Sequence, residues 1–84
     1  MVITQILVMK EEDLLRIVNE LLEEEGEDTL DSLDPSFDLK DDIGFDSLTL
    51  AHLTVMIESE FGVDIYADGI VRTVQEVYDK VNRQ

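Results

Sequence analysis

The chain has no cysteine and only one histidine, His52. Without cysteine there is no disulfide framework and no thiolate chemistry. Zinc sites draw on several Cys and His ligands, so this composition argues against a zinc protein as well. We therefore expect no catalytic residues and no metal ligands built from these side chains.

Basic residues are also scarce. Six Lys and Arg stand against 21 Asp and Glu, which gives a formal net charge of -15. Nucleic acids and anionic lipid surfaces attract basic proteins, so both are poor partners for this chain, and we expect neither nucleic-acid binding nor membrane insertion. A basic protein surface or a cation is the expected counterpart.

Long apolar runs are absent, and no segment reaches the length of a transmembrane helix. The opening "MVITQILVM" is apolar but short, and it has neither a basic start nor a small-residue cleavage site, so it does not resemble a signal peptide. We expect a soluble, cytoplasmic monomer without membrane insertion.

The 84 residues have the length of one small domain, and 44% of them are hydrophobic, which is typical of a folded chain. We assign residues 10–84 to this domain and residues 1–9 to an N-terminal extension or an earlier first turn of its first helix. That helix is predicted over 10–25, since Leu14, Ile17 and Val18 begin an apolar stripe with helical spacing. Ile3, Ile6 and Leu7 could extend the stripe backwards.

Residues 26–45 show no helical periodicity and are predicted to be a long loop. Because structureless loops of this length are uncommon in a compact domain, we expect apolar anchors to pack it across the helices, with a turn of helix near 36–42. The anchors are Leu30, Leu33, Phe37, Leu39 and Ile43.

Two further helices are predicted after this loop. The first spans 47–61, and the second begins at a capping box formed by Thr73 and Glu76. Between them we allow one or two helical turns over 66–72. The fold class is all-α: a four-helix bundle with three main helices, one short helix and a long first loop.

The helix over 47–61 carries two apolar stripes. One contains Leu50, Leu53, Ile57 and Phe61, and the other contains Leu48, Ala51 and Val55. Two stripes indicate a central helix covered on more than one side. The predicted open face is therefore the remaining one, which contains Thr49, His52, Met56 and Ser59.

The chain offers little for catalysis. His52 follows Ser47 by five residues, which is about 500° of helix rotation and a rise of roughly 7.5 Å, so the two side chains point about 140° apart. No Ser-His-Asp unit can form from them. A calcium loop starting at Asp38 fails too, because its third and sixth positions would be Lys40 and Ile43.

Asp46 and Ser47 stand together at the predicted start of a helix, where one capping residue would suffice. If Asp46 is the N-cap, its carboxylate accepts from the first-turn N–H groups. Ser47 is then the first helical residue, with its hydroxyl unengaged. A plain helix cap explains one of these residues but not both.

The segment "DDIGFDSLTLAHLTVMIESEFGVDI" resembles the prosthetic-group region of an acyl carrier protein. The family motif is an aliphatic residue, Gly, any residue, Asp, Ser, then Leu or Ile, and residues 43–48 read "IGFDSL". The resemblance covers about residues 10–82. It implies that a phosphopantetheinyl transferase attaches 4′-phosphopantetheine to Ser47, that the arm holds acyl groups as thioesters, and that the chain itself is not an enzyme.

The implied partners are that transferase and acyl-transferring and condensing enzymes with basic surfaces. In this family the exposed face of the second helix usually carries several acids, whereas the predicted open face here does not. A specialised pathway is therefore as plausible as central fatty-acid or polyketide synthesis. The alternatives are a carrier of amino or hydroxy acids, or an acidic interaction or cation-binding module without a prosthetic group. The predicted walls of an acyl cleft are Leu50, Ala51, Leu53, Ile57, Ile65 and Ile70.

Overall fold

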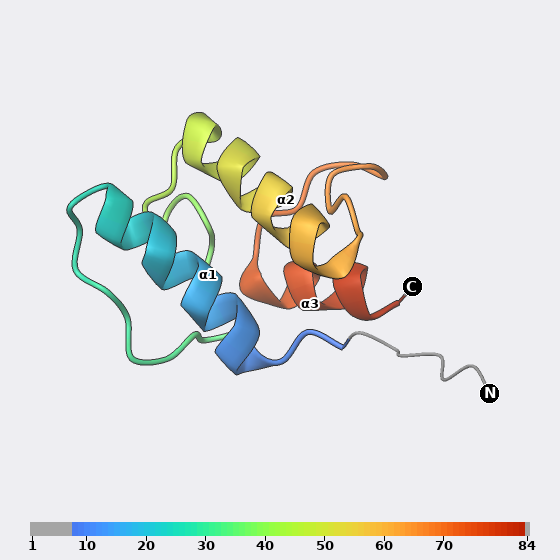
Figure 1. Cartoon of the computed structure of the whole chain (residues 1–84), viewed down its shortest axis with the longest axis horizontal. Helices are drawn as coiled ribbons and strands as arrows, with labels where there is room; N and C mark the ends of the chain where they lie inside the picture. The colour runs from blue at the N-terminus through green and yellow to red at the C-terminus, as the bar shows by residue number, and fades with distance from the viewer. Residues whose placement is uncertain (1–7, 84) are drawn as a thin grey trace.

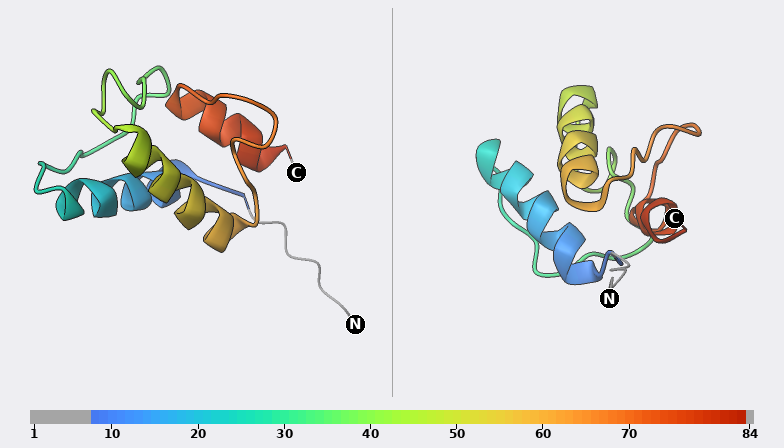
Figure 2. Two further views of the ribbon diagram at one scale, coloured as in Figure 1. Left: turned by 90° about the horizontal axis from the view of Figure 1, so that it is seen from above. Right: turned by 45° about the vertical axis from the view of Figure 1, so that its right-hand side comes forward.

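The computed structural model describes residues 8–83, and three helices form the framework of this part of the chain (Figure 1). They are α1 (Glu11–Glu24), α2 (Ser47–Phe61) and α3 (Val74–Asn82). α1 and α2 pack against each other and run in opposite directions, so the start of α2 lies near the end of α1 (Figures 1 and 2). The all-α class is confirmed, and no helix within 8–83 is long and apolar enough to cross a membrane.

α1 and α3 form as the sequence predicts. The apolar stripe of α1 is buried and its glutamates are exposed, while the half-buried Asp13 carboxylate accepts from the Lys10 N–H at 2.9 Å. At the start of α3, the Thr73 hydroxyl accepts from the Glu76 N–H at 3.2 Å, which confirms the predicted cap. Ile3, Ile6 and Leu7, the predicted extension of α1, lie outside the described residues.

The long connection between α1 and α2 packs through its apolar anchors. Leu33 and Leu39 are buried and the other three anchors are half-buried, as predicted. The predicted helical turn near 36–42 is a hydrogen-bonded turn, in which the Asp42 N–H donates to the Asp38 carbonyl at 3.0 Å. The loop then binds the chain just before α3, because the Leu39 N–H donates to the Arg72 carbonyl at 2.8 Å.

The prediction of a short fourth helix over 66–72 is wrong. This segment forms turns at 65–68 and then extended chain. The Asp64 carboxylate accepts from the Tyr66 N–H at 3.0 Å, which stabilises a turn rather than a helix. Gly69 has φ of 134°, outside the helical region. The segment 62–73 leaves the end of α2, loops outward and returns to the start of α3 (Figure 2).

The prediction of which sides of α2 are buried is also partly wrong. Leu53 and Ile57 of the first stripe are buried, but Leu48 and Val55 of the second are 81% and 64% exposed. Thr49, assigned to the open face, is buried instead. The helix is rotated relative to the prediction because hydrogen bonds to Asp46 and Glu25 satisfy the Thr49 hydroxyl inside the domain.

Met56 was also predicted on the open face and is half-buried against the core. His52 and Ser59 are exposed, as expected. The outward surface of α2 therefore carries apolar and uncharged residues along most of its length and acids near its end: Leu48, Ala51, His52, Val55, Glu58, Ser59 and Glu60.

Candidate functional site

Ser47 is the first residue of α2, and Asp46 is its N-cap. One Asp46 carboxylate oxygen accepts from the Thr49 N–H at 2.9 Å and from the Thr49 hydroxyl at 3.0 Å. These bonds, the backbone one foremost, hold the pKa of Asp46 below its usual value. Gly44, with φ of 90°, lets the chain turn sharply just before this cap.

The two adjacent capping residues therefore have different roles. The Asp46 carboxylate caps the helix, while Ser47 is exposed and its hydroxyl forms no hydrogen bond within residues 8–83. By contrast, the Ser36 hydroxyl donates to the Asp34 carboxylate at 2.7 Å. Ser47 thus presents a free nucleophilic oxygen to any enzyme that approaches the start of α2.

Side chains at the end of α1 contact the first turns of α2. The Thr49 hydroxyl also donates to the Glu25 carboxylate, and His52 Nδ1 lies 3.6 Å from a Glu24 carboxylate oxygen. Both contacts join the start of α2 to the end of α1. His52 is thereby directed toward Glu24 at the end of α1, although both side chains are largely exposed.

A cavity of about 550 Å³ opens beside Ser47, between α2, the long loop and segment 62–73. Three of the six predicted wall residues line it: Leu50, Ala51 and Ile70. The other three, Leu53, Ile57 and Ile65, are completely buried in the core, so their assignment to the cleft is wrong. The cavity is lined by Asp38, Leu39, Lys40, Asp41, Ser47, Leu50, Ala51, Tyr66, Ile70, Val71 and Arg72.

The wall residues missed from the sequence come from loops that meet only in three dimensions. Leu39 and Val71 approach each other because the Leu39 N–H donates to the carbonyl of Arg72, the residue that follows Val71. The Tyr66 hydroxyl donates to the Val71 carbonyl at 3.5 Å, and burial raises the pKa of this tyrosine. The periodicity of the sequence does not predict these contacts. The apolar residues in both loops indicate only that each loop packs against the helices.

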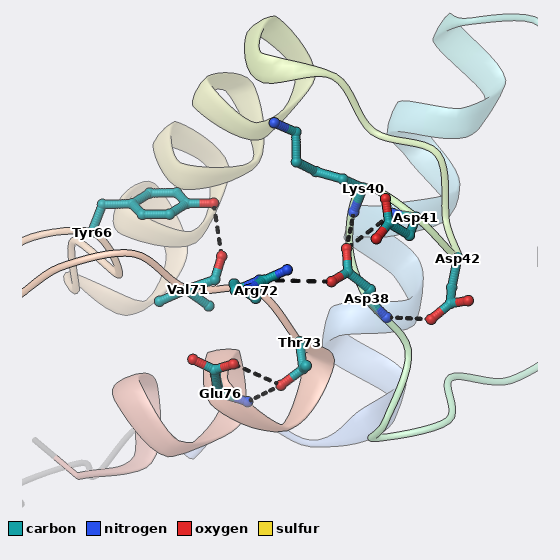
Figure 3. Close-up of polar contacts among 9 residues, drawn as sticks. All are labelled: Asp38, Lys40, Asp41, Asp42, Tyr66, Val71, Arg72, Thr73 and Glu76. Atoms are coloured by element: carbon teal, nitrogen blue, oxygen red, sulfur yellow. Dashed lines mark hydrogen bonds and ion pairs between the residues drawn. The ribbon is translucent and has the colours of Figure 1, made fainter.

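The polar rim of this cavity centres on Asp38 (Figure 3). Its carboxylate accepts from the Lys40 and Asp41 N–H groups at 2.8 and 2.9 Å and lies 3.9 Å from the Arg72 guanidinium. The bond from the Asp41 N–H is the main cause of a lowered pKa for Asp38. Asp38 is thus charged and already satisfied by its neighbours.

A second cavity, of about 480 Å³, lies on the other side of the first turns of α2, against the end of α1. It is lined by Leu21, Glu24, Glu25, Leu48, Thr49, Ala51 and His52. Within residues 8–83 there is no group of three or more His, Asp or Glu side chains placed to hold a metal ion.

An exposed serine at a helix start, next to an apolar cavity in a small all-α domain, is the arrangement of a carrier domain, which presents an attached group to other enzymes. The family model described as the phosphopantetheine attachment site matches residues 12–81, so the chain belongs to that family and its resemblance to the acyl carrier proteins is confirmed. Members of this family carry a covalently attached 4′-phosphopantetheine. Comparisons with curated proteins and with solved structures found no match.

Proposed function

We propose that Ser47 bears the 4′-phosphopantetheine arm through a phosphodiester and that the protein carries acyl groups for fatty-acid, polyketide or related biosynthesis. The observation that supports Ser47 is its free, exposed hydroxyl beside a capped helix start and an apolar cavity. These residues fit the group, because the serine oxygen is accessible and the cavity offers apolar walls for what the arm carries.

The chain's own residues hold and present the arm rather than react. Asp46 and Thr49 fix the first turn of α2, so the serine oxygen has a defined position. The base that removes the Ser47 proton is supplied by the phosphopantetheinyl transferase. Once attached, the arm contributes a terminal thiol that binds acyl groups as thioesters.

Partner enzymes are expected to contact the outward surface of α2. Leu48 and Val55 offer apolar contacts there, next to the exposed acidic residues Glu58 and Glu60. Acyl-transferring and condensing enzymes with apolar patches bordered by basic residues would complement this surface. We further propose that the carrier works as a monomer in the cytoplasm.

The test is incubation with coenzyme A and a broad-specificity phosphopantetheinyl transferase, followed by intact-mass measurement. We expect one phosphopantetheine increment on the wild type and none on Ser47→Ala. Ser59→Ala is the matched control, because Ser59 is exposed on the same helix and its loss should leave modification complete.

Modification of Ser47→Ala, or labelling at Ser32, Ser36 or Ser59, would contradict the assignment. A wild-type chain that no transferase modifies would favour an acidic interaction module instead. Loading of a holo chain with an amino or hydroxy acid by its own partner enzyme would favour that narrower class of carrier.

A further inference from the structure

The two cavities that flank the first turns of α2 differ in charge. Ala51 contributes to both, so they lie on either side of the same stretch of helix. The cavity that includes Ser47 has Lys40 and Arg72 among its walls, and Asp38 and Asp41 as acids. The second cavity contains two glutamates and no lysine or arginine.

Lys40 is the cation directed at the start of α2. Its backbone N–H is bound by Asp38, and its side chain extends from the loop toward the first turn of α2 (Figure 3). Its positive charge contributes to the lowered pKa of both Asp38 and Asp46, so the ammonium lies within electrostatic range of the residue next to Ser47.

The Lys40 ammonium is also available for a ligand. Two of the three nearby carboxylates have other partners: Asp38 binds two backbone N–H groups and pairs with Arg72, and Asp46 binds Thr49. The third, Asp41, adjoins Lys40 in the chain and lines the same cavity, but forms no ion pair with it in the described residues. Within residues 8–83 the ammonium itself forms no hydrogen bond or ion pair. Two of the six basic residues of a chain with net charge -15 thus line the cavity that includes Ser47.

We propose that Lys40 is a positioning residue for the arm: its ammonium pairs with the phosphodiester on Ser47 and directs the arm toward the cavity lined by Ile70 and Val71. The carboxylates of Glu24 and Glu25 repel the same anion from the other side of α2. This inference rests on the proposed function, because it requires the arm to be attached at Ser47.

The expected size of the effect follows from the exposure of Lys40. A surface ion pair is worth roughly 0.2–1 kcal/mol, which converts to about a 1.4- to fivefold change in the ratio of two populations. The pairing should weaken in salt, because the Debye length falls from about 10 Å at 0.1 M to about 3 Å at 1 M.

Paramagnetic relaxation on the holo protein tests the direction of the arm. Because the chain has no cysteine, a thiol-reactive nitroxide labels the arm alone. The measurement compares the broadening of the Ile70 and Val71 amide signals with that of Glu24 and Glu25. We expect stronger broadening at Ile70 and Val71, and in Lys40→Met a ratio lowered by about 1.4- to fivefold.

Lys10→Met is the matched control, since it removes the same charge from the start of α1, far from the start of α2 (Figure 1). It should leave the ratio unchanged, whereas Lys40→Glu should lower the ratio further than Lys40→Met. In 1 M salt the wild type should approach Lys40→Met.

The outcomes separate the two proposals. If the mass of the wild type shows no attached arm, or an arm at another serine, the proposed function fails and this inference fails with it. If Ser47 is loaded and Lys40→Met gives the same broadening ratio as Lys10→Met, the role of Lys40 is overturned while the carrier function stands.

Discussion

α1 and α2 pack against each other but use their outer surfaces differently. The outer side of α1 is acidic, and each of its fully buried residues belongs to one apolar stripe. α2 buries Leu53 and Ile57 yet leaves Leu48 and Val55 in solvent. The surface of α1 is explained by folding and solubility, whereas the exposed apolar residues of α2 contribute little to the core. They lie on the helix that begins at Ser47, which supports the proposal that partner enzymes contact α2.

Substitutions on the two sides of α2 should separate these roles most strongly. Leu53→Ala removes a completely buried side chain and should lower the free energy of unfolding by about 2–5 kcal/mol. Val55→Ala should change it by less than about 0.5 kcal/mol, because the side chain is exposed and alanine favours helix. Urea unfolding measures both, and a similar loss in the two variants would show that Val55 belongs to the core.

The exposed side of α2 should matter for partners instead. Leu48→Ala should lower kcat/KM for modification by the phosphopantetheinyl transferase by about tenfold, equivalent to about 1.4 kcal/mol, as expected for an apolar contact at the centre of an interface. Its thermal midpoint should remain that of the wild type. Val8→Ala is the control, because Val8 is also an exposed apolar residue but precedes α1. Equal kcat/KM for Leu48→Ala and the wild type would remove Leu48 from the docking surface.

The extents of the helices were largely predictable, because their signals are local. The stripe of α1, the Asp46–Ser47 start of α2 and the Thr73–Glu76 capping box each lie within a few residues of the boundary that they define. The sequence allows one or two helical turns over 66–72 because the apolar residues around Gly69 can pack. Val63, Ile65 and Val71 are buried without forming a helix, because the Asp64 turn bends the chain first, whereas Ile70 is 80% exposed.

The orientation of α2 was not predictable from its apolar pattern. Apolar residues occur on two sides of it, so periodicity could not tell the buried side from the exposed side. The position of Thr49 depends on Glu25, which lies 24 residues earlier in the chain. The geometry of Asp46 and Ser47 was predictable, but the approach of Lys40 and Arg72 to the cavity depends on contacts between distant segments.

The starts of α1 and α2 offer a further contrast, because the side chain of the N-cap bonds the first turn in α2 but not in α1. Asp46→Ala should lower the thermal midpoint at pH 7 by a few degrees. The pKa of Asp46 is depressed in the folded state, so its contribution is complete above the unfolded value of about 4 and is lost as the pH falls through the folded value.

The difference between wild type and Asp46→Ala should therefore shrink on acidification, as followed by thermal unfolding from pH 7 to pH 2. Asp46→Asn keeps a capping oxygen without the titration, so its midpoint should differ from that of Asp46→Ala by the same amount at every pH. A gap between wild type and Asp46→Ala that persists at pH 2 would mean that the carboxylate is not what stabilises the start of α2.

The smallest expected effect concerns the ion pair that joins the two helices. Arg16 of α1 donates to both carboxylate oxygens of Glu60 of α2, at 3.0 and 2.6 Å, and these bonds raise the pKa of Arg16. Because both side chains are partly exposed, Arg16→Met should cost only about 0.2–1 kcal/mol, and the cost should fall as salt screens the pair. The wild-type midpoint should instead rise with moderate NaCl, since the same screening relieves repulsion within a chain of net charge -15. Thermal unfolding of both proteins across a NaCl titration therefore gives two curves that both rise and converge. Curves that stay parallel would show that Arg16 stabilises the contact between α1 and α2 through the packing of its aliphatic stem rather than through its charge.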